Sequence, residues 1–232
     1  ILNFIPFSYV KKINLKSSEN SRIVQIGRIT DNKNQIELLK AYRKLNINIP
    51  LVFIGAEDES YLKKCKDYIQ SHGLDNVQFL GYRENPWFEV GDKDICVFTS
   101  KIETFGMVYI ESLLNGIPTI VSNNKGYESV KGIFSEGEMY PLGNTDALSK
   151  MILDLLTNFD EKKQEMIHSS ENISKLYSLD YAYREIIQQV NLDGPCKSKE
   201  SDKYLYFLNV KLTMKDRLKQ LLKTLLKLKK LR

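Results

Sequence analysis

The chain has 232 residues, of which 42% are hydrophobic, so it can bury a sizeable core. Its formal net charge of +5 is unevenly spread: residues 211–232 carry nine basic residues and one acidic residue, a net +8, which leaves the remainder at −3. A mildly acidic body disfavours a general nucleic-acid surface, so we expect no nucleic-acid partner. No stretch is long and apolar enough to predict a membrane span.

The cysteines help to indicate the compartment. Cys65, Cys96 and Cys196 lack the spacing of a metal or redox motif, and Cys96 lies inside an apolar segment. We therefore expect reduced thiols and a cytoplasmic protein. The two histidines are too few for a zinc site.

Apolar runs alternate with helical patterns through most of the chain. The runs are short and continuous, which is typical of a parallel sheet covered by helices on both faces. Asn34 and Glu37 resemble a capping box at the start of the first helix. The expected strands are 23–26, 51–54, 77–80, 95–99, 119–121 and 139–140. The expected helices are 34–45, 58–72, a central one closed near 115–118, then 146–158, 161–177 and about 180–190.

The pattern divides the chain into four segments. Residues 1–20 are a linker-like entry, 21–191 form the α/β domain, 192–203 are a polar linker, and 204–232 are a basic tail. Leucines recur at helical spacing through 211–232 with lysines between them, and such an amphipathic helix suits an anionic membrane surface. A helix packed on a partner subunit and a disordered extension are the alternatives.

The central segment is residues 101–118, which contain two carboxylates with seven residues between them. Glu103 should lie in the loop leaving a strand, and Glu111 on the helix that follows. Gly106 lets the backbone approach a ligand, and the free amides of residues 105–108 favour a phosphate at the helix start. Carboxylates on either side can accept hydrogen bonds from sugar hydroxyls. The segment predicts a nucleotide-sugar site.

Two cations follow the first expected strand. That strand ends at Gly27, and Arg28 and Lys33 lie in the loop that leads to the first helix. Together they can neutralise a diphosphate, the arginine as a planar fork and the lysine as a point charge. The alternative is that both are solvated surface charges, as such residues usually are.

The other candidates have plain alternatives too. Tyr82 and Arg83 follow the third strand and can border a base, or they can be ordinary turn residues. Glu103 or Glu111, taken alone, can be one more exposed carboxylate. All of these residues fall beyond the carboxyl ends of strands, where parallel α/β sheets bind ligands. This shared location favours a binding site.

The ordered motifs carry a family resemblance. The segments GRITDNKN, FLGYRENP and ETFGMVYIESLLNGIPTIVS resemble the retaining glycosyltransferases of family 4, which have the two-domain GT-B fold. The resemblance covers about residues 1–190 and corresponds to that family's C-terminal, donor-binding domain, a Rossmann-like parallel sheet. Glu103 and Glu111 match the family's E-x7-E motif.

The resemblance implies roles for the candidate residues. The catalytic ones are Glu103, Arg28 and Lys33. The binding roles are donor sugar and phosphate for Gly27, Phe105, Gly106, Met107 and Val108, ribose for Glu111, and base for Gly81, Tyr82 and Arg83.

Departures from the family pattern are mostly small. Thr104 stands where the family often has glycine, Ser112 where it has alanine, and Asn34 where a glycine often follows the lysine. A larger one is that the family's N-terminal, acceptor-binding domain is not part of the sequence, which begins with Ile1 rather than Met. We expect a piece of a longer or split enzyme, with the acceptor domain supplied in cis or in trans.

The expected function is that of a hexosyltransferase-type glycosyltransferase. The co-substrate would be a UDP- or GDP-linked sugar, and no Asp-x-Asp-like metal set is in a fitting place, so no metal is expected. Retention of configuration follows from the resemblance alone. The acceptor would be a glycan or a lipid-linked glycan of cell-surface polysaccharide or glycolipid synthesis, with the protein peripheral on the inner face of the plasma membrane.

Two other functions stay open at this point. The first is a non-catalytic donor-binding or regulatory subunit that needs a separate acceptor-domain chain. The second is a membrane-peripheral adaptor with a vestigial site, and the intact Arg28, Lys33, Glu103 and Glu111 argue against it.

Overall fold

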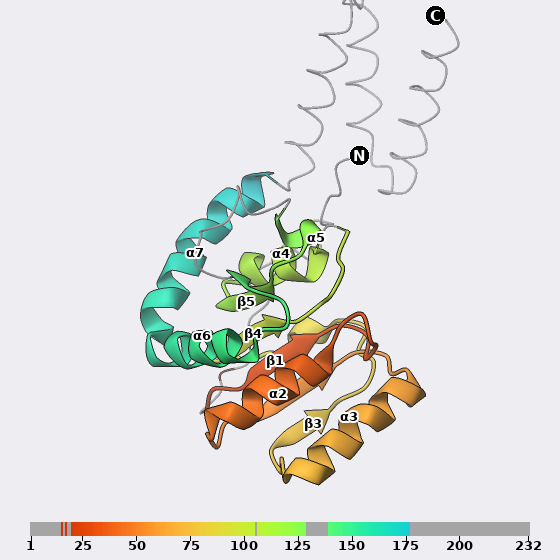
Figure 1. Cartoon of the computed structure of the whole chain (residues 1–232). Coiled ribbons are helices and arrows are strands. Elements are labelled where there is room, and N and C mark those ends of the chain that lie inside the picture. The colour runs from red at the N-terminus through yellow and green to blue at the C-terminus, as the bar shows by residue number, and fades with distance from the viewer. Residues whose placement is uncertain (1–14, 16, 18–19, 105, 129–138, 177–232) are drawn as a thin grey trace, which may run out of the picture. The chain divides into compact units, whose positions relative to one another are not determined.

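The computed structural model describes residues 15, 17, 20–104, 106–128 and 139–176, and Figure 1 shows their arrangement. Phe105, Cys196, the helix expected near 180–190, the linker 192–203 and the basic tail therefore lie outside the described residues, and the predictions for them stay predictions. Within the described part of the chain, none of the helices is both long enough and apolar enough to cross a bilayer.

The core of the molecule is a six-stranded parallel sheet in the order β3-β2-β1-β4-β5-β6. Every predicted strand is present, and each boundary falls within one residue of its prediction. The strands are β1 (Ile23–Ile26), β2 (Leu51–Ile54), β3 (Val77–Phe79), β4 (Ile95–Phe98), β5 (Thr119–Ser122) and β6 (Met139–Tyr140).

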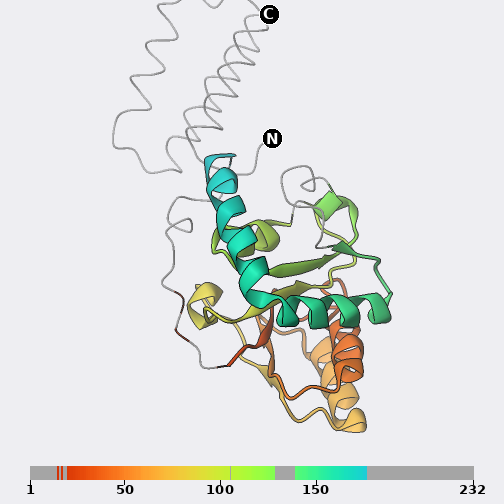
Figure 2. The same cartoon turned by 90° about the vertical axis from the view of Figure 1, so that its left-hand side faces the viewer.

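Helices cover both faces of this sheet (Figures 1 and 2). Figure 2 also shows α7 turning sharply away from α6. Two short helices, η1 and α5, are not in the prediction. The helices are α2 (Gln35–Leu45), α3 (Glu59–His72), the 3-10 helix η1 (Pro86–Glu89), α4 (Met107–Leu114), α5 (Lys125–Glu128), α6 (Thr145–Thr157) and α7 (Phe159–Leu176).

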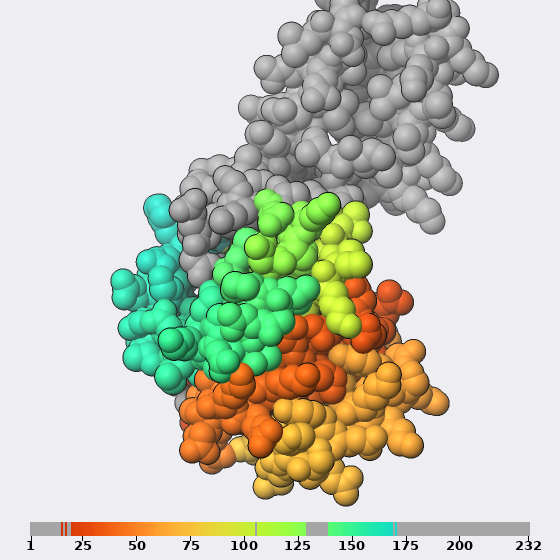
Figure 3. Space-filling view, viewed as in Figure 1, coloured from red at the N-terminus to blue at the C-terminus, as the bar shows by residue number. Residues whose placement is uncertain are grey.

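Alternate residues of the strands enter two separate cores, as the pleat of a strand requires. Ile95 and Val97 of β4 pack with residues of α2, α3 and α6, which cover much of the lower part of the surface seen in Figure 3. Cys96 and Phe98 pack on the opposite face with residues of η1, α4 and α7. This double covering explains why the strands are continuous apolar runs. The predicted Rossmann-like α/β fold is confirmed.

The capping box predicted at the start of α2 is wrong. Asn34 has a left-handed conformation (φ 56°), and its side chain accepts no hydrogen bond from the helix. Its amide instead donates to the Glu37 carboxylate. That carboxylate also accepts from the Tyr140 hydroxyl (2.9 Å) and the Gly143 amide (2.7 Å). Glu37 therefore ties α2 to the end of β6 and does not reach back to the Asn34 backbone.

The strand order reverses once, between β1 and β4. Chain connections run outward in one direction from β1 and in the other from β4, so the order reverses between these two neighbours. Open α/β sheets bind ligands at such a switch point, beyond the carboxyl ends of the strands. The loops that follow β1 and β4 meet there.

Candidate functional site

Asn32 joins the loop after β1 to the loop after β4. Its side-chain amide donates to the Ile102 carbonyl (3.0 Å), its side-chain oxygen accepts from the Ile102 amide (3.2 Å), and its carbonyl accepts from the Lys101 amide (2.8 Å). An exposed ion pair between Lys101 and Asp31 (2.7 Å) reinforces the contact. The two loops are therefore held as one unit across the switch point.

Two buried polar residues, Gln25 and Thr99, hydrogen-bond to the backbone of the loop after β1. Gln25 donates to the Lys33 carbonyl (2.9 Å), and the Thr99 hydroxyl donates to the Asn34 carbonyl (2.9 Å). Gln25 also donates to Thr99 across the two strands (3.2 Å). Sequence reasoning missed both residues, although a glutamine inside the apolar run IVQI was an available signal. Their hydrogen bonds fix the backbone that carries Lys33.

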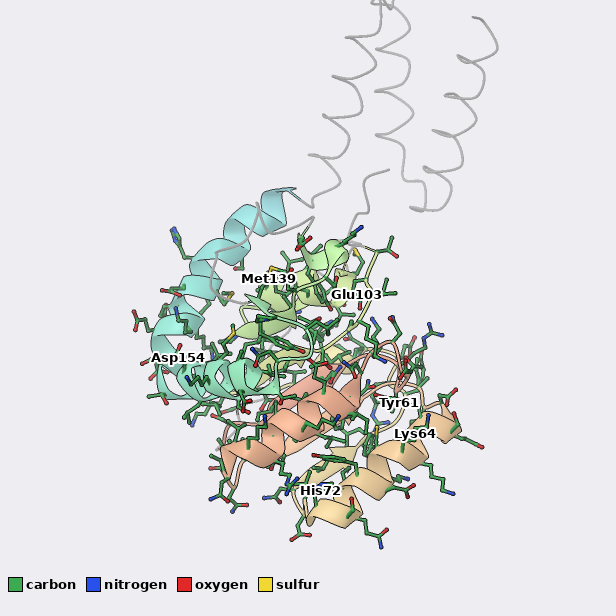
Figure 4. All side chains as sticks on the ribbon, in the orientation of Figure 1. Tyr61, Lys64, His72, Glu103, Met139 and Asp154 are labelled. Atoms are coloured by element: carbon green, nitrogen blue, oxygen red, sulfur yellow. The ribbon has the colours of Figure 1, made fainter. Side chains whose placement is uncertain are left out.

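Lys33 and Glu103, predicted to share a site, form an ion pair across the switch point. Their side chains are only 21% and 14% exposed, so the pair is partly shielded from water. A Cβ added at Gly27 would lie 3.6 Å from the Lys33 methylene groups, so the lysine stem passes over this glycine in ordinary contact. Figure 4 shows Glu103 close to the loop that leaves β1.

Glu103 is held on its other side by α5. A Cβ added at Gly126 would come within 2.3 Å of the Glu103 carbonyl oxygen, so only glycine fits there. The next residue, Tyr127, is buried, and the pKa of its hydroxyl is raised by burial and by the nearby Glu103 carboxylate. Glu103 therefore lies between a cation and a buried phenol.

The start of α4 provides free backbone donors beside this pair. Gly106 precedes the helix with a left-handed backbone (φ 69°), and a Cβ there would clash with the Tyr127 ring at 2.5 Å. Among the described residues, none accepts a hydrogen bond from the amides of Met107 and Val108. The first turn carries no acidic residue, so this helix start suits an anion. Phe105 lies outside the described residues.

Glu111 has a different environment from Glu103. It lies on α4, and its Oε2 accepts a hydrogen bond from the indole Nε1 of Trp87 (3.1 Å). Burial raises the pKa of Glu111, and the indole hydrogen bond partly counteracts this rise. Trp87 is a residue that sequence reasoning missed. It is 1% exposed and directly follows the segment FLGYRENP, and nothing in the sequence indicates its partner 24 residues away.

The remaining candidates are near strand ends but make fewer contacts. Arg28 is exposed, and within the described chain its guanidinium has no bonded partner. Gly81 has a left-handed backbone (φ 70°) and accepts from the Gly55 amide (2.9 Å). Tyr82 is 70% exposed, whereas Arg83 pairs with Glu89 (3.2 Å). Among the hydrogen bonds and ion pairs of the described residues, none joins these three to Glu103 or Glu111.

The arrangement is suited to an anion flanked by hydroxyl groups. Lys33, the exposed Arg28 and the α4 amides supply positive charge and donors, and the two glutamates supply acceptors. The described part of the chain brings no three histidine, cysteine or acidic side chains together as a potential metal site.

Sequence comparisons give related enzymes. A poly(glycerol-phosphate) alpha-glucosyltransferase of Bacillus subtilis is 28% identical over 167 residues, covering 69% of this chain and 24% of that protein. A Campylobacter jejuni N-acetylgalactosamine-N,N'-diacetylbacillosaminyl-diphospho-undecaprenol 4-alpha-N-acetylgalactosaminyltransferase is 26% identical over 160 residues, covering 68% and 42%. The chain thus spans less than half the length of these two relatives.

Structure comparisons agree on the fold. HepE of Anabaena, solved in complex with UDP and glucose, has a TM-score of 0.66 at 20% identity, covering 74% of this chain and 48% of that one. A glycosyltransferase of Rickettsia africae has a TM-score of 0.71 at 20% identity, covering 81% and 55%.

The family is shown by a match along most of the described domain. The family described as "Glycosyl transferases group 1" matches residues 9–172, which is more than half of the 232-residue chain. That range contains the loops after β1 and β4 and all of α4. The chain belongs to the group 1 glycosyltransferases.

Proposed function

We propose that this chain is the donor-binding part of a retaining, family 4 glycosyltransferase that uses a nucleoside-diphosphate sugar. The observation that carries the proposal is the Lys33–Glu103 pair at the switch point, beside the amides of Met107 and Val108, from which no described residue accepts a hydrogen bond. A cation, a helix start and a carboxylate in one place match the diphosphate and the sugar of such a donor.

The roles of individual groups follow from their chemistry. Breaking the bond between the sugar and the diphosphate leaves negative charge on the leaving group. The ion-paired Lys33 and the backbone amides of Met107 and Val108 are held in place, and together with the exposed Arg28 they stabilise this charge, which is the electrostatic form of catalysis. Glu103 accepts hydrogen bonds from hydroxyls of the donor sugar, and Glu111 accepts them from the ribose.

The donor, acceptor and location are proposed from the relatives and the resemblance. HepE of Anabaena has been solved with UDP and glucose, which supports a uridine nucleotide carrying a hexose. The Campylobacter jejuni relative is named for an undecaprenol-linked glycan, which supports a lipid-linked or polysaccharide acceptor. We propose that transfer needs no metal, and that the protein works at the inner face of the plasma membrane.

A second candidate is a donor-binding subunit that depends on a separate acceptor-domain chain. The described groups at the switch point would bind a donor equally well in such a subunit. Sugar-transfer assays distinguish the two candidates. A single relative-length protein that contains this chain transfers sugar by itself if the chain is part of an enzyme. A donor-binding subunit transfers sugar only after a separate acceptor-domain chain is added.

The test of donor binding is calorimetric titration with UDP, GDP and their sugar conjugates. We expect one nucleotide family to bind, and Lys33→Ala to weaken that binding by about tenfold or more, since a hydrogen bond to a charged group is worth about 1.5–3 kcal/mol. The control is Lys63→Ala, which removes an exposed lysine of α3, a helix that carries none of the candidate site residues. Absence of binding by both this chain and a relative-length protein would overturn the proposal.

A further inference from the structure

Trp87 connects the loop after β3 to the helix that carries Glu111. It is the only tryptophan in the chain, it is 1% exposed, and its Nε1 donates to Glu111 Oε2 at 3.1 Å. Buried indole N–H groups usually have an acceptor. Here that acceptor is a carboxylate of the proposed donor site.

Local structure fixes the position of the indole. The Asn85 side chain accepts from the Trp87 amide (3.2 Å) and begins η1, and Pro86 takes the first position of this turn. The Trp87 carbonyl then accepts from the Val90 amide (3.2 Å). The ring packs in the same core as Leu113 of α4. The donor atom therefore has little freedom to move away from Glu111.

The contact also has an electrostatic consequence. Burial raises the pKa of Glu111, because a charged carboxylate is costly away from water. The nearby indole is a neutral donor, so it favours the ionised carboxylate without cancelling its charge. It bonds only Oε2, and no described residue bonds Oε1. Within the described part of the chain, one carboxylate oxygen is thus held while the other is left to accept from a ligand.

We propose that Trp87 is a positioning residue for recognition of the nucleotide ribose, holding Glu111 so that its second oxygen accepts from the ribose hydroxyls. This inference rests on the proposed function, in which Glu111 contacts the ribose. Trp87 also shares the β3–β4 connection with Tyr82 and Arg83, the proposed neighbours of the base. The β3–β4 connection would then contact the base directly and position Glu111 for the ribose.

The experiment compares nucleotides with and without ribose hydroxyls. Wild type is titrated with UDP and GDP, and the tighter ligand is then compared with its 2′,3′-dideoxy form in wild type, Trp87→Phe, Glu111→Gln and the double variant. We expect Trp87→Phe to weaken the ribonucleotide by about tenfold and to change the dideoxy form less than about twofold. In the Glu111→Gln background the same change adds no further selective loss.

The control is Phe88→Leu, which alters the neighbouring, 58% exposed ring of η1 without touching the Trp87–Glu111 contact. We expect this variant to bind both ligands as wild type does. Equal losses for both ligands in Trp87→Phe would show that the tryptophan only supports packing, and unchanged affinities would show that its N–H is not needed. Either result overturns the inference.

A second measurement covers the case in which Trp87→Phe fails to fold. Because Trp87 is the only tryptophan, the emission of the wild-type chain reports on this one indole. Adding the ribonucleotide should shift the emission, and adding the dideoxy form should not. Equal shifts overturn the inference but leave the proposed function standing, since both ligands then bind. Failure of wild type to bind any nucleotide overturns both.

Discussion

Glu103 and Glu111 lie on one short segment, yet the structure places them in opposite surroundings. Glu103 is paired with the cation of Lys33 and is 14% exposed, whereas the side chain of Glu111 has, among the described residues, the neutral indole of Trp87 as its hydrogen-bond donor. A cation compensates the charge of a carboxylate, but a neutral donor leaves that charge uncompensated, and burial accordingly raises the pKa of Glu111. The two glutamates of one motif are therefore expected to respond differently to substitution and to pH.

The largest expected effect is that of Glu103→Gln. The change keeps the shape of the side chain but removes the charge that pairs with Lys33. We expect sugar transfer by a relative-length protein to fall by about a hundredfold, since misplacing one fixed group of a site commonly costs this much. Steady-state kinetics measure the loss, with Glu165→Gln on α7 as the control. Near-normal transfer by Glu103→Gln would remove the pair from the proposed mechanism.

An intermediate effect is expected from acid on Glu111. Its pKa is raised in the folded chain, so on lowering the pH it gains a proton at a higher pH than an ordinary glutamate does. A protonated carboxyl accepts hydrogen bonds less well, and ribonucleotide affinity should therefore fall as the pH drops through this raised pKa. Titrations from neutral pH downward test this. Glu111→Gln should lack this component, and identical pH profiles for the two proteins would contradict the prediction.

The smallest effect is expected from Asp31→Asn. This residue pairs with Lys101 at the surface, where the two side chains are 76% and 40% exposed. Water and salt screen such a pair, so we expect the free energy of unfolding to change by less than about 1 kcal/mol. Urea denaturation measures the change. A much larger loss would mean that the charge pair, rather than Asn32, joins the two loops.

The fold could be predicted closely because its strands are buried on both faces. Such strands are continuous apolar runs, and Gly27 and Gly55 mark the ends of two of them. The short helices η1 and α5 were not predicted, since a single turn has no hydrophobic periodicity. The capping box failed for a tertiary reason: Glu37 contacts Tyr140, about a hundred residues away.

The candidate site was predictable in its members but not in its contacts. Lys33 and Glu103 were assigned to one ligand, but their direct pairing depends on β1 lying next to β4, which a pattern of strands does not specify. The same holds for Trp87, whose partner is determined by how η1 packs on α4. The sequence therefore predicts which residues of one loop can bind a ligand. It does not predict which residues of different loops contact one another, because that depends on the strand order.

The hydrogen bonds of Asn32 determine whether the two loops at the switch point become ordered during folding or only when a ligand binds. Its side chain and its carbonyl bond the loop after β4, so both loops at the switch point take their positions when the chain folds. The conformational entropy of this part of the site is therefore lost during folding and not during ligand binding. A ligand that meets loops already in place keeps more of its contact energy as affinity.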